Sequence, residues 1–397
     1  MKMAITSLIF IAALTSLGNA ERDPSAPPPQ NDILTIGALL PLHGEGSNYG
    51  ISAQIALKTA EADINKHFSD FGRTIRLQVV VEDTRTDPDI TLKALKALQT
   101  QGIRIIIGPE QSQCLANVRE YADQNGIILI SGGSTAQSLA IENDTTFRLV
   151  PDDATLAHLL AFLMQRDGIK VLIPLARRDL WADGMLNATK HEFNGDGRIM
   201  LDAVRYDPQT TNFSSQLSLL RSQVRNATEG YGENRIAIYV SAFDEIVTIL
   251  SQASGDPVLC SVRWYGNDLT NAAISQNKTA ADFALSVNFL SPVIGGIYGP
   301  KYERIKKAIF NETGLDACSL AANDYDALWL ITYTYLLAES HDAQTFKQAF
   351  PVVAERYRGE FGWMKLNDAG DLENVPYTIA NLKKDNDTFQ WVPYAIL

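Results

Sequence analysis

The hydrophobic pattern beyond residue 32 repeats one unit several times. Each unit has a short apolar run, a loop of small and polar residues, and a longer segment with apolar positions at helical spacing. The run at 33–40 is continuous rather than alternating, which is typical of a strand buried on both faces. Further strands are expected at 75–82 and 127–130. Between them, Ile51, Ile55 and Ile64 follow the spacing of one helix face. The pattern predicts successive βα units.

The βα pattern is interrupted at 147–153, which indicates a crossover. It then resumes, with further strands expected at 170–175, 202–206, 235–240 and 261–265. A return strand is expected at 287–292, a helix at 325–340 that packs back on the first sheet, and a hairpin around 367–370. The predicted fold class is α/β, with two doubly wound parallel-sheet lobes joined by crossing hinge strands. We expect lobe 1 to hold 33–150 plus 291–360, and lobe 2 to hold 151–290 plus 361–397.

Residues 1–20 have the layout of a secretory signal peptide, with Lys2, a short apolar run and a small-residue end at Ala20. A membrane anchor is the alternative, but the run is shorter than the roughly 20 residues of a span. Residues 21–32 contain several prolines and read as an extended linker. We therefore expect an extracytoplasmic protein.

Composition narrows the function classes. The net charge of −12 argues against nucleic-acid binding and against docking on anionic lipid. Cys114 is expected to be buried, and a disulfide between Cys260 and Cys318 stays open, because sequence does not show whether they meet. The cysteines and histidines have no metal-ligand spacing. Glycosylation of the sequons also stays open; these begin at Asn143, Asn187, Asn212, Asn226, Asn277, Asn311 and Asn386.

The stretch 105–135 carries the candidate binding chemistry. One apolar run ends in a loop that reaches Ser112 at an expected helix start, and the next ends in Gly133, Ser134 and Thr135. Carboxyl ends of neighbouring parallel strands meet at one edge of a sheet, where ligands bind in open α/β folds. Hydroxyls and backbone N–H groups at a helix start suit a carboxylate or another small anion.

An enzyme is the alternative that this sequence disfavours. Glycines at 44, 46 and 50 follow a strand, and Tyr302 and Lys306 have the spacing of a dehydrogenase dyad. The glycine spacing departs from the dinucleotide fingerprint, however, and the following acid comes too late. We read the glycines as a ligand-loop turn and Tyr302 and Lys306 as a solvated helix face. No catalytic residues and no cofactor are expected.

These segments together resemble type I periplasmic binding proteins, specifically the leucine/isoleucine/valine-binding group of solute receptors for ABC importers. The resemblance spans 36–393 and is carried by IGALLPLHGEGSNYG, VVVEDTRTDP, IIGPEQS, ISGGST, FRLVPDD, the Tyr325-Asp326-Ala327 segment and GEFGWMKLNDAGD. It implies a monomer that captures an amino acid by lobe closure and delivers it to a membrane permease. The same fold also serves ligand-sensing receptors and amide-responsive regulators, so a sensor is the alternative.

The resemblance also implies a ligand site. Ser112 matches the serine that binds the ligand carboxylate, and an acid at 268 falls where the α-ammonium is held. The expected ligand-binding residues are Tyr49, Ser112, Gly133, Ser134, Thr135, Trp181, Phe243 and Asp268.

Some of these positions depart from the family pattern. Trp181 stands where tyrosine is usual, Phe243 also lacks a hydroxyl, and Asp268 is shorter than glutamate. Arg177 and Arg178 are expected to be solvated; if one of them faced the cleft, the ligand could be a dicarboxylate or another anion.

Overall fold

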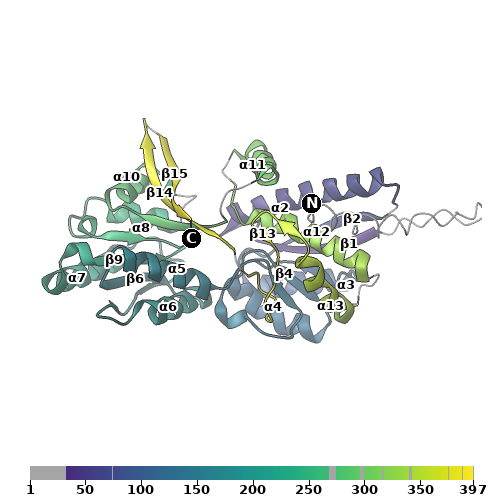
Figure 1. Cartoon of the computed structure of the whole chain (residues 1–397), viewed down its shortest axis with the longest axis horizontal. Coiled ribbons are helices and arrows are strands. Elements are labelled where there is room, and N and C mark those ends of the chain that lie inside the picture. Colours follow the sequence, from purple (N-terminus) through teal and green to yellow (C-terminus); the bar gives the residue numbers. More distant parts are fainter. Residues whose placement is uncertain are drawn as a thin grey trace, which may run out of the picture.

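A computed structural model describes residues 33–73, 75–267, 274–295, 299–314, 317–338, 342–373, 375–386 and 388–396. The expected signal peptide (1–20), the expected linker (21–32) and Asp268 lie outside these ranges. Within them the chain forms two α/β lobes, each with its own sheet (Figure 1). Lobe 1, on the right of the view, combines the purple and blue N-terminal segments with the lime-green helices α12 and α13. The predicted fold class is confirmed.

Lobe 1 is built on a parallel sheet in the order β2-β1-β3-β4-β5. Because the order reverses between β1 and β3, the loops that follow these two strands diverge and leave a crevice at their carboxyl ends. The elements are β1 (Ile33–Leu40), α2 (Ser47–Asp70), β2 (Arg76–Asp83), α3 (Pro88–Thr100), β3 (Ile105–Ile107), α4 (Ser112–Gln124), β4 (Ile128–Ser131), η1 (Gln137–Leu139) and β5 (Thr146–Arg148).

A second set of helices completes lobe 1 after the chain has passed through lobe 2. It comprises α11 (Pro300–Thr313), α12 (Ala321–Ala338), α13 (Ala343–Ala354) and the small pair β12 (Arg358–Gly359) and β13 (Gly362–Trp363). Helix α12 is apolar on nearly all sides and is buried against α2 and α13, as such a helix must be. Its first turn lies beside the end of β4, where the Asn323 side-chain amide donates to the Gly132 carbonyl oxygen at 3.1 Å.

Lobe 2 has a sheet in the order β15-β14-β11-β10-β9-β6-β7, with β8 paired to β6. Strands β6 to β11 are parallel, whereas β14 and β15 form an antiparallel hairpin at the edge, so this sheet is mixed. The elements are α5 (Asp153–Arg166), β6 (Val171–Arg177), α6 (Leu180–Phe193), β7 (Ile199–Met200), β8 (Val204–Tyr206), α7 (Ser214–Tyr231), η2 (Glu233–Arg235), β9 (Ile236–Ser241), α8 (Ile246–Ala253), η3 (Leu259–Ser261), β10 (Arg263–Tyr265), α10 (Lys278–Ser286), β11 (Leu290–Ile294), β14 (Tyr377–Asp385) and β15 (Thr388–Ile396).

The structure shifts two of the expected lobe boundaries. Strand β11 pairs with β10 and β14, so lobe 2 extends to Ile294 rather than ending at 290. The tail returns later than 361, because Asp371 bridges Arg148 of β5 and stays beside lobe 1. The turn at 367–370 forms as expected, with Gly370 N donating to Asn367 O at 2.9 Å, but the long hairpin is β14–β15.

The structure also tests several expectations about buried and exposed residues. Tyr302 is on the buried face of α11, so the prediction that it is solvated was wrong, whereas Lys306 is exposed as expected. Cys114 is buried as expected, and Cys260 and Cys318 are not joined by a disulfide. The asparagine of every sequon is exposed, as glycosylation requires. Among the described residues, no helix is both long and apolar enough to cross a membrane.

Candidate functional site

A cavity of about 110 Å³ lies where the two lobes meet. Lobe 1 lines it with residues that follow β1, β3 and β4 and precede α12: Gly46, Asn48, Tyr49, Glu110, Gln111, Ser112, Gly133, Thr135, Cys318 and Leu320. Lobe 2 contributes Trp181, Phe243 and Asp244. The sequence-based set therefore gathers at this cavity except for Ser134, which lies behind its wall, and Asp268, which is outside the described residues.

Ser112 is fixed by the neighbouring loop rather than by its own helix. Gln111, not Ser112, occupies the N-cap of α4, and it makes no side-chain cap bond. The Ser112 Oγ accepts the backbone N–H of Ala136 at 3.3 Å and lies 3.1 Å from the Ser134 Oγ. With Ser134 as donor in that pair, the Ser112 O–H remains able to donate to a ligand in the cavity that the residue lines. Ser134 is thus a positioning residue.

The segment around Gly133 runs close to the cavity because it carries no side chain there. A Cβ on Gly133 would lie 3.1 Å from Glu110 Oε2 and 3.2 Å from Tyr49 Cε1, closer than ordinary contact. Arg148 also holds this loop in place, because its guanidinium donates to the carbonyl oxygens of Ser134 and Ala136 at 3.3 and 2.8 Å. The loop is therefore held between two sets of side chains.

Two stacked aromatic rings form the wall of lobe 2. Trp181 enters from the first turn of α6, whose N-cap Asp179 accepts the Ala182 N–H at 2.9 Å. Phe243 follows β9, and its ring stacks on Trp181 with centroids 4.8 Å apart. Such pairs add about 0.5–1.5 kcal/mol beyond the area they bury. Together with Tyr49 from lobe 1, the rings give the cavity apolar faces.

Arg177 joins the lobes beside this wall. Its guanidinium donates to both carboxylate oxygens of Glu45 in lobe 1, and to Asp179 and Glu245 in its own lobe at 2.5 and 3.1 Å. It also lies 4.0 Å from the centroid of the Phe243 ring. Burial alone lowers the pKa of an arginine, but the Glu45 hydrogen bond and the surrounding carboxylates raise the pKa of Arg177 above its usual value.

Arg177 is 3% exposed, so the expectation that it is solvated was wrong. Three carboxylates surround its guanidinium, which leaves it no charge to offer a second ligand carboxylate. Asp244 makes a parallel contact between the lobes, since its carboxylate accepts the backbone N–H of Gly46, and burial raises its pKa.

Glu110 was missed by the sequence reasoning. It lines the cavity at 3% exposure, and its carboxyl is hydrogen-bonded to that of Asp324 on α12. The Tyr49 hydroxyl donates to Asp324 Oδ2 at 3.1 Å. An acid two residues before a candidate binding serine, after an apolar strand, is the signal that was available in the sequence.

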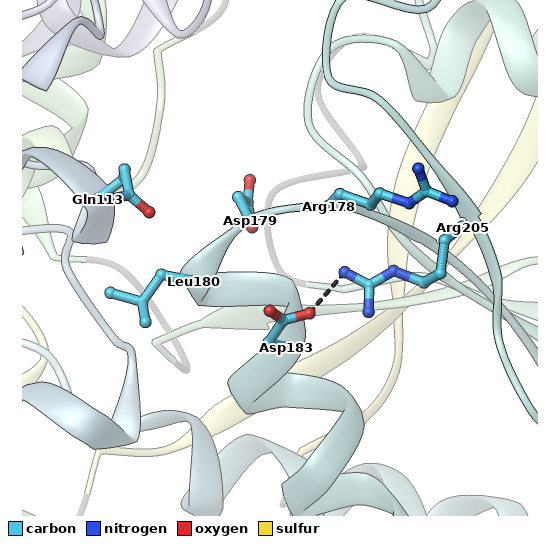
Figure 2. A pocket seen from close by; sticks show the side chains of 6 residues that line it. All are labelled: Gln113, Arg178, Asp179, Leu180, Asp183 and Arg205. Atoms are coloured by element: carbon cyan, nitrogen blue, oxygen red, sulfur yellow. Dashed lines mark hydrogen bonds and ion pairs between the residues drawn. The ribbon is translucent and has the colours of Figure 1, made fainter.

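A larger but open depression of about 540 Å³ lies at the rim between the lobes (Figure 2). It is lined by Gln113 of lobe 1 and by Arg178, Asp179, Leu180, Asp183 and Arg205 of lobe 2. Figure 2 shows Arg205 bonded to Asp183, at 2.5 Å, and Arg178 extending along the same side. This depression lacks the hydroxyls and aromatic rings that line the enclosed cavity. Arg178 is exposed, as expected.

The sequence matches the family described as "Receptor family ligand binding region" over residues 52–385. The chain belongs to this family. The resemblance to the leucine/isoleucine/valine-binding group of type I periplasmic binding proteins is confirmed as well. The family consists of ligand-binding modules, which agrees with a site that has two lobes and a cavity between them.

Curated relatives align with different shares of this chain. An uncharacterised protein of Methanocaldococcus jannaschii is 28% identical over 95% of this chain and 93% of its own. Leu/Ile/Val-binding protein BraC3 of Rhizobium johnstonii is 25% identical over 48% of this chain and 52% of its own. BasB of Halobacterium salinarum, a chemotactic signal transduction system substrate-binding protein, is 28% identical over 34% of each chain.

Solved structures share the fold of the whole described chain. The leucine-binding protein LivK of Thermotoga maritima superposes with a TM-score of 0.74 at 18% identity, covering 92% of this chain and 98% of its own. A solute-binding protein of an ABC transporter from Rhodopseudomonas palustris, in complex with 3,4-dihydroxybenzoic acid, gives 0.76 at 14% identity, covering 92% and 97%. The fold thus accommodates both aliphatic amino acids and aromatic acids.

Proposed function

We propose that this chain is an extracytoplasmic solute-binding protein that captures a small monocarboxylate, an amino acid or an aromatic acid, by closing its two lobes, and passes it to the permease of an ABC importer. The observation that carries this proposal is the enclosed cavity, with Ser112 and Thr135 on one lobe and the Trp181–Phe243 stack on the other. Its volume has room for on the order of ten non-hydrogen atoms. Leucine and benzoate are of that size.

The ligand carboxylate binds to lobe 1. The Ser112 hydroxyl, the Thr135 hydroxyl and the backbone beside Gly133 are its donors. Charge-assisted hydrogen bonds of this kind contribute about 1.5–3 kcal/mol each in a closed, dry site. The apolar part of the ligand packs between Tyr49 and the lobe 2 rings.

An ammonium group, where the ligand has one, binds to an acid of lobe 2. The resemblance assigns this role to Asp268, and Asp244 is a second acid at the cavity wall. A dicarboxylate is disfavoured, because Arg177 is already neutralised and Arg178 lies outside the cavity.

A thermal-shift screen tests the proposal. A ligand at one hundred times its Kd stabilises the folded state by about 2.7 kcal/mol, which raises the Tm by several degrees. The panel contains L-leucine, L-isoleucine, L-valine, benzoate, 4-hydroxybenzoate, L-aspartate and leucinamide. We expect at least one monocarboxylate to raise the Tm and L-aspartate to have no effect. A response to leucinamide alone would overturn the carboxylate cradle.

A sensor is the second candidate function. It is favoured by one observation: the relative BasB belongs to a chemotactic signal transduction system. Pull-down of the intact protein with solubilised membranes of its source, followed by mass spectrometry, separates the two roles. A permease subunit as the captured partner supports transport, and a chemotaxis transducer supports sensing.

A further inference from the structure

The lobe 1 wall of the cavity holds a buried acid that the proposed ligand contacts leave unused. Glu110 follows Pro109 after β3, is 3% exposed and lines the cavity. Its Oε2 lies 3.4 Å from the Ser131 Oγ, and the carboxyl also accepts the Gly132 N–H. Among the described residues its Oε1 accepts no N–H or hydroxyl donor, so the carboxyl depends on the acid beside it for a further hydrogen bond.

A second acid lies directly behind it. Asp324 comes from the first turn of α12, is fully buried, and its carboxyl is hydrogen-bonded to Glu110. The groups that face this pair are the Tyr49 hydroxyl from α2, Ser131 and Gly132 from the end of β4, and the Cys318 thiol beside Tyr49. Among these described neighbours none is a cation.

Two buried carboxyl groups in contact, without a cation, do not both ionise. Burial raises the pKa of Asp324 well above its usual value, and the negative charge of Glu110 raises it further. Burial also raises the pKa of Glu110, from 4.5 to about 7, although hydrogen bonds from Tyr49 and Asp324 lower it. The pair therefore keeps one proton, on Asp324, and burial lets Glu110 hold a second proton to a higher pH than an exposed carboxyl does.

We propose that Glu110 is a specificity-determining residue of the ligand site, which accepts one carboxylate together with one proton and rejects that carboxylate once Glu110 is ionised. This inference rests on the proposed function, because it needs the ligand carboxylate at the Ser112–Thr135 side of the cavity. Glu110 precedes Ser112 by two residues, and its Oε2 is 3.1 Å from the point where a Cβ added to Gly133 would lie. A carboxylate in that cradle lies against the Glu110 carboxyl.

The sign of the pH dependence separates this role from its opposite. If Glu110 must be protonated, carboxylate affinity falls as pH rises past about 7, approaching tenfold per pH unit. If instead ionised Glu110 held the ligand's ammonium, affinity would rise over the same range. A merely structural Glu110 would leave affinity independent of pH.

The proton itself is measured without any ligand. The infrared spectrum of the intact protein at pH 6 should contain the carbonyl band of protonated carboxylic acids, reduced in Glu110→Gln and further reduced in the double variant with Asp324→Asn. Glu82→Gln, an acid at the end of β2 that does not line the cavity, is the matched control and keeps the band. A wild-type band that Glu110→Gln leaves unchanged overturns the inference.

Stability gives the same information independently. Glu110 holds its proton more tightly in the folded than in the unfolded chain, so its ionisation destabilises the folded state between pH 4.5 and about 7. The Tm of the wild type should therefore fall, relative to that of Glu110→Gln, as pH rises through this window. If Glu110→Gln does not fold, Asp324→Asn serves instead; its amide is neutral and still donates to Glu110, so the fall of the Tm between pH 4.5 and about 7 should persist in this variant.

The ligand arm uses benzoate and L-leucine, whose carboxylates are ionised throughout, with titration calorimetry from pH 6 to 8.5. We expect the wild-type Kd to rise at least tenfold across this range and the Kd of Glu110→Gln to stay within about twofold of its pH 6 value. Binding with a pH-independent Kd in the wild type overturns this inference and leaves the proposed function standing. If neither these nor any other monocarboxylate of the panel binds at pH 6, both fail.

Discussion

The contact between Glu45 and Arg177 gives a direct test of how the lobes close. Glu45 lies in the loop after β1 of lobe 1, and Arg177 ends β6 of lobe 2. Glu45→Gln removes the charge but keeps one acceptor and the length of the side chain. In the variant the Arg177 guanidinium still pairs with the carboxylates of Asp179 and Glu245, so the substitution leaves no unpaired buried charge.

The size of the effect follows from this geometry. A charge-assisted hydrogen bond contributes about 1.5–3 kcal/mol, and the amide keeps a weaker version of one of the two bonds. The Glu45 side chain is 23% exposed, which reduces the value further through solvent screening. We expect the closed state to lose about 1–2 kcal/mol, a factor of roughly 5 to 30. Measured from the open, ligand-free protein, binding weakens by the same factor.

Calorimetry on the ligand found by the thermal-shift panel measures this change, and small-angle scattering measures closure. Glu45→Gln should raise the Kd five- to thirty-fold and enlarge the radius of gyration of the liganded protein at subsaturating ligand. Asp183→Asn is the control, because its partner Arg205 is 2.5 Å away in the same lobe (Figure 2). An unchanged Kd in Glu45→Gln, or an equal loss in Asp183→Asn, refutes the reasoning.

Other consequences of the structure are open to simple measurements. Ser112→Ala should weaken carboxylate binding at least tenfold, measured by calorimetry. It should also lower the free energy of unfolding in urea by about 1–3 kcal/mol, because the buried Ala136 N–H loses its acceptor. An unchanged free energy of unfolding would contradict this hydrogen bond. Asp371→Asn leaves the buried Arg148 unpaired and should cost about 3–5 kcal/mol in the same assay, where a loss below 1 kcal/mol would mean the pair is dispensable. Alkylation of Cys318 should slow when ligand binds, while alkylation of Cys260, away from the cavity in lobe 2, should not; equal rates would place the ligand elsewhere.

The fold was predictable because its signals are local. The continuous run at 33–40 is β1, and the expected helix start at Ser112 begins α4. Buried parallel strands and amphipathic helices each carry their pattern within a few residues. The hairpin β14–β15 was placed too early, since alternation in the tail marked strands without showing which turn joins the longer pair.

The lobe boundaries were less predictable for a physical reason. An apolar run around 290 indicates a strand, but only pairing with β10 and β14 assigns β11 to lobe 2. In the same way Asp371 stays with lobe 1 because of its ion pair with Arg148. Pairing partners that lie far along the chain leave no mark in the local pattern.

On the lobe 1 side, the loops expected to bind the ligand line one cavity, and Ser112 begins α4 as expected, with Gln111 as the N-cap. Ligand binding by these residues stays a prediction. The strand order places the carboxyl ends of β3 and β4 side by side, so Ser112 and Gly133 had to be neighbours. The acid pair escaped because Asp324 arrives on α12, from the far end of the chain. The position of Glu110 before Ser112 was visible in the sequence, whereas its pairing with Asp324 was not.

The charges around the cavity argue together for a ligand with a single carboxylate. Arg177, the buried cation nearest the aromatic wall, is held by Glu45 and two further acids and contributes to closure instead of to ligand charge. The remaining charged groups of the described cavity wall are Glu110 and Asp244, both acids. A second ligand carboxylate would meet only negative charge, so a dianion would have to bring more than one proton or a metal ion with it. A zwitterion or a monocarboxylate needs at most the one proton that Glu110 can hold.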